Sequence, residues 1–350
     1  MDTTGDGDWR DRWSLEDLPQ PTDDPARARL DIDIFGYCLL HNTVPEPLLS
    51  AVRARLDDQA AAEKRLGLAF EDGGPRQQWG QFRDAAGHLR GNAFTAANGG
   101  INQRVWMLVN KGAPFREVLA LAPMLDVVGH VLGEEFLLSS FTANIAKPGG
   151  VPMALHTDQW WAPEPTRRGR RPLPVGSMTR NRFDHDAALG AAPAPTLAPA
   201  AVSNVLVMLD GMTTANGGTR VVPGSHLAGR HPDPARDGNV ATVAAEGPPG
   251  CAIITDGRLW HGTGANTGDS DRAALILTFC GPQYRPQENY TLGTRPELLD
   301  DLPARTRALL GFKVWWAYGR TGDPTVDFID PRTPLIGELH AADADPAQAD

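Results

Sequence analysis

The sequence has few cysteines, no long apolar run and no excess of basic charge, and each shortage excludes a class of protein. Its three cysteines, Cys38, Cys251 and Cys280, lie far apart and lack zinc-finger spacing, which favours reduced core thiols over a disulfide framework. No hydrophobic run approaches the roughly 20 residues of a transmembrane helix, and the first residues lack a signal-peptide pattern. We therefore expect a cytoplasmic protein with no membrane partner.

The charge balance argues against a nucleic-acid partner. Lys and Arg number 33 against 43 Asp and Glu, for a net charge of −10, whereas proteins that bind a phosphate backbone need a positive field. With 41% hydrophobic and 22% charged residues, the chain has an ordinary globular composition. A wholly disordered or fibrous protein is thereby excluded.

Glycine and proline are abundant, with 37 and 30 copies in 350 residues. Many of them separate short β-type runs, and others lie in a Pro- and Arg-rich segment at 163–200, which we interpret as an insertion or lid. Residues 1–28 are polar and predict a flexible N-terminal arm, and residues 342–350 predict a disordered tail. The remainder, 29–341, is expected to form one catalytic domain and not the two that the length suggests.

The periodicity predicts helices in the first half of the chain and strands in the second. Apolar spacing indicates a helix from Thr43 to Arg65, and a second helical region at Phe115–Leu132 that Pro123 should kink or split. Short β-type runs are expected at Ile32–Leu40, Phe136–Ile145, Val202–Asp210, Gly218–Val222, Cys251–Thr255 and Ala273–Phe279. Their spacing favours an antiparallel sandwich or barrel.

A metal-ligand pattern lies in the β-rich half. His156 and Asp158 are two residues apart in LHTDQWW, so an extended backbone places both side chains on one face. His261, in DGRLWHGTGAN, supplies a second imidazole. Two histidines and a carboxylate form the facial triad of non-haem Fe(II) oxygenases. Arg272, eleven residues later, could bind the carboxylate of a keto-diacid through two parallel hydrogen bonds.

Other interpretations of these residues are open at this point. An isolated His-x-Asp pair often occurs by chance, and a single histidine is more often structural than ligating. Two histidines and a carboxylate also suit a zinc hydrolase or isomerase, although such an enzyme needs no buried anchor like Arg272. A non-catalytic binding module should have lost one of the three ligands, and all three are present.

Two segments, Asp210–Arg230 (DGMTTANGGTRVVPGSHLAGR) and Gly250–Thr267 (GCAIITDGRLWHGTGANT), resemble the phytanoyl-CoA dioxygenase family. This family is a branch of the Fe(II)- and 2-oxoglutarate-dependent oxygenases, and the resemblance covers roughly residues 30–290. It implies an all-β core with flanking helices (an α+β chain), arranged as a double-stranded β-helix, the cupin-like jelly roll. The segment between the ligands is longer than is typical of the family, so substrate residues cannot be transferred there.

The resemblance also assigns roles to single residues. It implies iron ligands at His156, Asp158 and His261, and 2-oxoglutarate contacts at Arg272, Thr263 and Asn144. Trp161 and Trp160 are candidate substrate contacts, because aromatic side chains gather near the expected opening. Trp106, elsewhere in the chain, is a further aromatic candidate, and Arg220 is either a solvated strand end or a contact to an anionic substrate. The Pro-Gly-Ser-His turn at 223–226 is interpreted as structural.

The implied activity is hydroxylation of an unactivated C–H bond in a small metabolite or natural-product intermediate. Fe(II), 2-oxoglutarate and O2 would take part, with release of succinate and CO2. Related halogenases carry a small residue in place of the ligand carboxylate, so Asp158 favours hydroxylation over halogenation. Desaturation, cyclisation and epimerisation use the same ligands and stay open, as do the zinc enzyme and the binding module. A homodimer is compatible with the sequence.

Overall fold

The structure is a computed structural model. It describes residues 8–72, 86, 101–150, 152–159, 200–228, 231–232, 237–314, 325–333, 337–338 and 340. The expected lid at 163–200 (except Ala200), the tail at 342–350, Trp160 and Trp161 lie outside the described residues.

Seven strands of the described chain form a large antiparallel sheet. In spatial order they are β1 (Tyr37–Leu40), β8 (Ala252–Asp256), β5 (Val202–Met208), β10 (Arg272–Cys280), β4 (Leu137–Ala146), β3 (Asn102–Val105) and β2 (Phe70–Asp72). From β1 to β4, neighbouring strands of this sheet are not consecutive in sequence, so the chain crosses repeatedly between its layers, as in a jelly roll.

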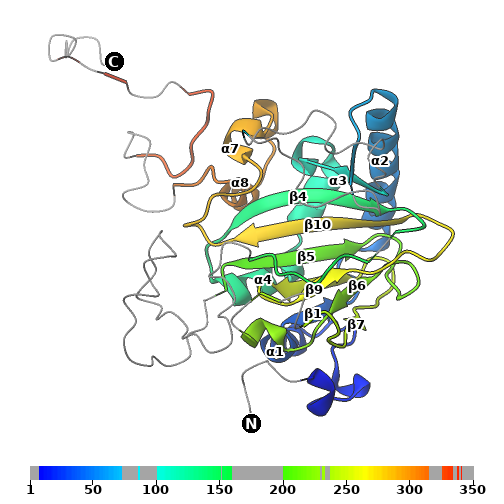
Figure 1. The fold of residues 1–350 in the computed structure, drawn as a ribbon. Coiled ribbons are helices and arrows are strands. Elements are labelled where there is room, and N and C mark those ends of the chain that lie inside the picture. The colour runs from blue at the N-terminus through cyan, green and yellow to red at the C-terminus, as the bar shows by residue number, and fades with distance from the viewer. Residues whose placement is uncertain are drawn as a thin grey trace, which may run out of the picture.

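A smaller sheet faces the large one (Figure 1). Its strands are β7 (Val243–Ala244), β6 (Thr219–Val221) and β9 (His261–Thr263), in that order. Residues 153–156 extend this sheet beyond β9, because Met153 N–H donates to the Thr263 carbonyl and His156 pairs with His261. Two opposed antiparallel sheets with flanking helices confirm the predicted fold class.

The two faces of the large sheet differ in what covers them. Helices α1 (Pro25–Phe35), α2 (Glu46–Arg65), α3 (Ala113–Leu119) and α4 (Ala122–Leu132) cover one face (Figure 1). There they bury alternate strand residues such as Val205, Val207 and Leu275 in one apolar core. Strand residues alternate between faces, so Leu206, Met208 and Ala274 point the other way, into a second core shared with the small sheet.

Several shorter elements complete the described chain. They are the 3-10 turns Trp9–Asp11, Leu15–Asp17, Leu108–Asn110, Ser225–Ala228 and Pro296–Leu298, and the helices α7 (Tyr290–Gly293) and α8 (Ala304–Leu309). The split expected near Pro123 is confirmed, since α3 and α4 are separate and Pro123 lies in the first turn of α4.

The first strand is shorter than the sequence predicts. Residues 32–35 belong to α1, because Asp24 caps its N-terminus and Pro25 occupies its first turn. Gly36 ends the helix with a left-handed φ of 81°, a conformation that glycine adopts without steric cost. The apolar run Ile32–Leu40 therefore divides into the end of a helix and the strand β1.

The expected flexible arm at 1–28 differs from the structure over residues 8–28, while residues 1–7 lie outside the described chain. Trp9 is 3% exposed, and its indole Nε1 donates to the Ala241 carbonyl. Trp13 packs edge-on against Phe35 with ring centroids 5.0 Å apart. The polar composition of this segment predicted a flexible arm, but Trp9 and Trp13 bury large apolar areas and attach it to the domain.

Trp9→Ala should lower the free energy of unfolding by about 3–5 kcal/mol, the usual cost of removing a buried aromatic side chain. The matched control is Leu15→Ala, in the same segment but 65% exposed, which should change stability by less than about 0.5 kcal/mol. Chemical denaturation of both variants measures the difference. Equal stabilities would show that the segment does not pack as described.

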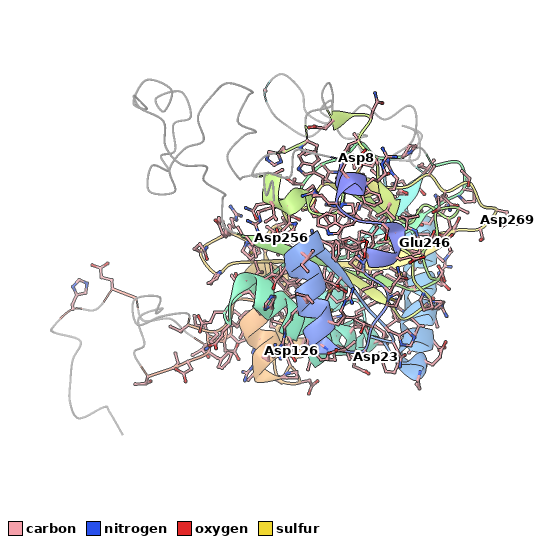
Figure 2. All side chains as sticks on the ribbon, turned by 90° about the horizontal axis from the view of Figure 1, so that it is seen from below. Asp8, Asp23, Asp126, Glu246, Asp256 and Asp269 are labelled. Carbon is pink, nitrogen blue, oxygen red and sulfur yellow. The ribbon has the colours of Figure 1, made fainter. Side chains whose placement is uncertain are left out.

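Charge is spread over the surface. Acidic side chains such as Asp23, Asp126 and Asp269 are exposed and lie in separate regions of the molecule (Figure 2). In the part of the chain that the structure describes, no helix combines the length and the apolar character needed to cross a bilayer.

Candidate metal centre

The two predicted histidine ligands face each other across a backbone pair. The amide of His156 donates to the His261 carbonyl at 2.9 Å, and the amide of His261 donates to the His156 carbonyl at 3.0 Å. Such reciprocal bonding marks a hydrogen-bonded antiparallel pair, whose side chains lie on the same face. The imidazole centroids are 4.5 Å apart, so residues 105 positions apart in sequence form one site.

Asp158 completes the group. Its Oδ1 lies 3.6 Å from His156 Nε2, and its Oδ2 lies 3.2 Å from His261 Nε2. One ligand atom from each of the three residues falls within 4.8 Å of the others. Imidazole nitrogens and a carboxylate oxygen at this separation suit a first-row divalent metal and leave coordination positions open.

The ring orientation of each histidine is fixed by its other nitrogen. His156 Nδ1 lies 3.0 Å from the Ala154 carbonyl, and His261 Nδ1 lies 3.0 Å from the Leu259 carbonyl. Because a carbonyl only accepts, Nδ1 carries the proton in both rings, and each Nε2 is available as a ligand. The donor set therefore fits the iron that the sequence predicts.

Electrostatics prepare the group for a cation. Burial alone would raise the pKa of Asp158, but His261 and a hydrogen bond from Asn204 lower it to about 2. Burial lowers the pKa of His156, and the neighbouring His261 lowers it further. Burial would also lower the pKa of His261, yet Asp158 raises it above its ordinary value. At neutral pH the site thus offers an ionised carboxylate and a neutral His156.

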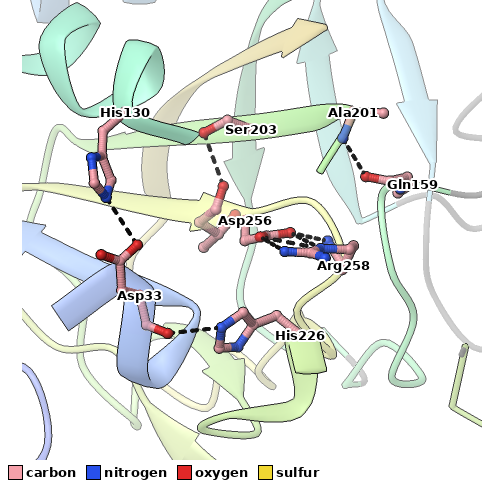
Figure 3. Close-up of polar contacts among 9 residues, drawn as sticks. Asp33, His130, Gln159, Ala201, Ser203, His226, Asp256 and Arg258 are labelled. Atoms are coloured by element: carbon pink, nitrogen blue, oxygen red, sulfur yellow. Dashed lines mark hydrogen bonds and ion pairs between the residues drawn. The ribbon is translucent and has the colours of Figure 1, made fainter. Parts of the chain in front are cut away.

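A tight turn holds the backbone of Asp158. The Gly257 carbonyl accepts from the amides of Asp158 and Gln159, both at 3.0 Å. The Gln159 side chain accepts from the Ala201 amide at 2.7 Å, which ties this segment to the start of β5 (Figure 3). A Cβ on Gly257 would lie 2.6 Å from the Val202 Cβ. Glycine is therefore required at 257, because this turn and the start of β5 approach each other closely.

Gly257→Ala should therefore both destabilise the fold and weaken metal binding. Overpacking of this kind typically costs about 1–3 kcal/mol, and displacement of the turn moves Asp158. Gly129→Ala is the control, because a Cβ there would lie 3.7 Å from Phe136 in ordinary van der Waals contact, inside a helix that favours alanine. Thermal melting with and without Co(II) reports both effects; a Gly257 variant that matches the Gly129 variant would contradict this role.

Arg272 lies at the start of β10 on the face of the large sheet that the helices leave uncovered. It is 2% exposed, and its Nη2 donates to the Gly217 carbonyl at 2.8 Å. Its Nε is buried without a hydrogen-bond partner. Burial lowers the pKa of Arg272 to about 10, so it stays cationic at neutral pH. A buried cation with an unused donor fits an anionic ligand.

The other two 2-oxoglutarate candidates, Asn144 and Thr263, lie on strand faces that point toward the space between the two sheets. Asn144 is opposite Ala274 in the register of β4 and β10, which places it diagonally beside Arg272 on one face. Its Oδ1 is buried and lacks a partner. Thr263 shares a face of β9 with His261, two residues away. The structure gives neither residue a contact with Arg272.

The substrate candidates are placed less uniformly. Trp160 and Trp161 lie outside the described residues. Trp106 is 37% exposed and packs edge-on against Phe70, with centroids 5.4 Å apart. Arg220 pairs with Gly262, so its side chain leaves the face opposite to His261, and its Nη2 donates to the Met153 carbonyl at 2.7 Å. The structure thus places Arg220 behind the metal ligands and not among them.

The Pro-Gly-Ser-His turn is built into the scaffold. His226 is 3% exposed, with its Nε2 3.2 Å from the Asp33 carbonyl (Figure 3). Ser225 Oγ accepts from the amide of Trp260, the residue before His261. The turn thus holds the backbone next to His261, which agrees with the structural role expected for the turn.

Sequence reasoning assigned no role to two residues of the site face. Asn204 donates to Asp158 and lies on a strand whose other residues are mostly apolar, so its polarity was the available signal. Arg104 is opposite Asn144 on β3, and its charge helps to lower the pKa of both His156 and Arg272. No motif marks Arg104, because only the sheet register brings it there.

Comparison with known proteins identifies the group to which this site belongs. The family model described as phytanoyl-CoA dioxygenase (PhyH) matches residues 33–274, which include the three metal ligands and Arg272. The chain belongs to the phytanoyl-CoA dioxygenase family. The predicted family is confirmed, and iron and 2-oxoglutarate are the cofactors expected of that family.

Individual relatives agree with this assignment. Dioxygenase af480 of Aspergillus fumigatus is 34% identical over 210 residues, covering 60% of this chain and 58% of that protein. Dioxygenase FUM3 of Gibberella moniliformis is 34% identical over 132 residues, covering 37% and 42% respectively. The chain thus spans about half the length of the curated relatives it matches. In fold it resembles SnoK, a non-haem α-ketoglutarate-dependent carbocyclase from nogalamycin biosynthesis (TM-score 0.50, 18% identity, 81% of this chain and 94% of that one).

Proposed function

We propose that this protein is an Fe(II)- and 2-oxoglutarate-dependent oxygenase that hydroxylates a C–H bond of a small metabolite. The observation that carries the proposal is the convergence of His156, Asp158 and His261 within 4.8 Å. A buried Arg272 with an unused Nε–H supports it. When bound, iron with 2-oxoglutarate and O2 supplies the oxidising power for the C–H bond, and succinate and CO2 are released.

The chain's own residues bind and orient. His156 and His261 direct their Nε2 atoms toward Asp158, because each Nδ1 proton is engaged by a backbone carbonyl. Arg272 offers its unused Nε–H to the distal carboxylate of the cosubstrate, and the apolar floor at Leu206 and Ala274 excludes water. Such an anchor has no use in a zinc hydrolase, so it favours the oxygenase over that alternative.

The substrate binds beside this floor. Phe70 is opposite Arg104 in the register of β2 and β3, so it lies on the same face as Asn144, and Trp106 packs against it. An aromatic pair next to polar side chains fits a partly apolar small molecule with a few polar groups. Trp106 is therefore proposed as a substrate contact, as are Trp160 and Trp161.

The test is succinate release across a panel of partly apolar metabolites, under ¹⁸O2. A true substrate should raise succinate above the uncoupled background and yield a product that carries one ¹⁸O atom. A product that has lost two hydrogens or changed configuration without gaining oxygen would replace hydroxylation by desaturation or epimerisation. Absence of 2-oxoglutarate-dependent succinate in a folded, iron-loaded protein would contradict the oxygenase itself.

A further inference from the structure

Asn204 lies on the face of the large sheet that is turned toward the small sheet, and its side chain contacts the carboxylate of Asp158. It lies near the start of β5, is 1% exposed, and donates from Nδ2 to Asp158 Oδ2 at 2.8 Å. A buried amide on a central strand is costly unless its groups are bonded. A buried amide inside an otherwise mainly apolar strand therefore indicates a specific role.

The chemistry of the two groups fixes the orientation of the amide. An ionised carboxylate only accepts, so the NH2 group of Asn204 must face Asp158. The amide oxygen then points away, and this Oδ1 is buried without a partner. The side chains beside it in the register, Thr255 and Thr278, are also buried. The one side-chain hydrogen bond of Asn204 among the described residues is therefore the one to Asp158.

The hydrogen bond from Asn204 gives the two carboxylate oxygens of Asp158 different environments. Oδ2 accepts a hydrogen bond from Asn204 and lies 3.2 Å from His261 Nε2, while Oδ1 accepts no hydrogen bond from any described residue and lies 3.6 Å from His156 Nε2. The backbone of Asp158 is already held by the Gly257 carbonyl. Asn204 thus removes the remaining freedom, rotation of the side chain.

We infer that Asn204 is a positioning residue, which holds the Asp158 carboxylate in the orientation that the metal requires. The inference rests on the proposed function, because it concerns the same metal site. Removal of an outer partner of a metal ligand typically costs about 10–100-fold in metal affinity. The same loss is expected here, with the fold intact.

The experiment measures Co(II) binding to the metal-free full chain by calorimetry and by visible d–d absorption. Asn204→Leu removes the donor at similar volume, and Asn204→Asp keeps the shape but replaces the donor by an acceptor. Both should weaken Co(II) binding about 10–100-fold and change the d–d spectrum. Thr278→Val, which removes a neighbouring hydroxyl that does not contact Asp158, is the control and should bind like the wild type. Unchanged affinity and spectrum in the folded Asn204 variants would overturn the inference.

A double-mutant cycle separates positioning from a general structural effect. If Asn204 acts through Asp158, then Asn204→Leu should have no further effect on Co(II) affinity in an Asp158→Ala background. An equal loss in both backgrounds would reject the positioning role. Failure of the wild type to bind Co(II) through His261 would overturn the proposed function and this inference together, whereas tight wild-type binding with unaffected Asn204 variants overturns the inference alone.

Discussion

His261→Ala should weaken metal binding by at least about 100-fold. The side chain supplies one of three ligands, and outer-sphere losses alone typically reach about 10–100-fold. Its imidazole is 11% exposed and 3.2 Å from Asp158, so no other described side chain can replace it without movement of β9. Calorimetric titration of the metal-free protein with Co(II) measures the loss.

The control for that variant is His41→Ala. His41 is exposed and lies beside Asp23, so it reports adventitious metal binding by a surface histidine. It should leave the high-affinity Co(II) site unchanged. If the His261 variant retained wild-type affinity while remaining folded, the metal centre would not be where the three side chains converge.

Arg272→Ala should weaken 2-oxoglutarate binding about 100-fold, or about 2.8 kcal/mol, while metal affinity stays close to that of the wild type. The guanidinium is buried and cationic, and its loss removes the charge-assisted hydrogen bonds expected to hold the distal carboxylate. Equilibrium binding of 2-oxoglutarate to the Co(II)-loaded protein, under anaerobic conditions, gives the affinity.

Arg272→Lys separates charge from shape. Lysine keeps the positive charge but lacks the planar fork, so it should recover only part of the affinity. Thermal melting checks the fold, because both variants also lose the bond to the Gly217 carbonyl. Wild-type 2-oxoglutarate affinity in the Ala variant would reject the anchor role of Arg272.

Local patterns predicted which three side chains converge, because the candidate metal site uses short motifs. His156 and Asp158 are two residues apart, and the Gly-rich context of His261 and its distance to Arg272 are local as well. Strand periodicity in 273–279 likewise predicted β10. These features depend on neighbours in the chain, which a sequence displays directly.

The remainder of the site depends on register between distant strands. Arg104 joins the site only through its pairing with Asn144, and Arg220 leaves it because its pairing with Gly262 turns it to the opposite face. A shift of one residue would reverse both placements. Trp9, in a polar segment, packs against residues more than 200 positions away. No local pattern encodes such contacts.

The most direct test of the account is the visible absorption of the anaerobic protein with Fe(II) and 2-oxoglutarate. Binding of the keto acid to an iron held by His156, Asp158 and His261 should produce a weak charge-transfer band that requires both components. The band should disappear in His261→Ala. A folded wild-type protein that binds Fe(II) and 2-oxoglutarate yet shows no such band would contradict the proposed metal centre.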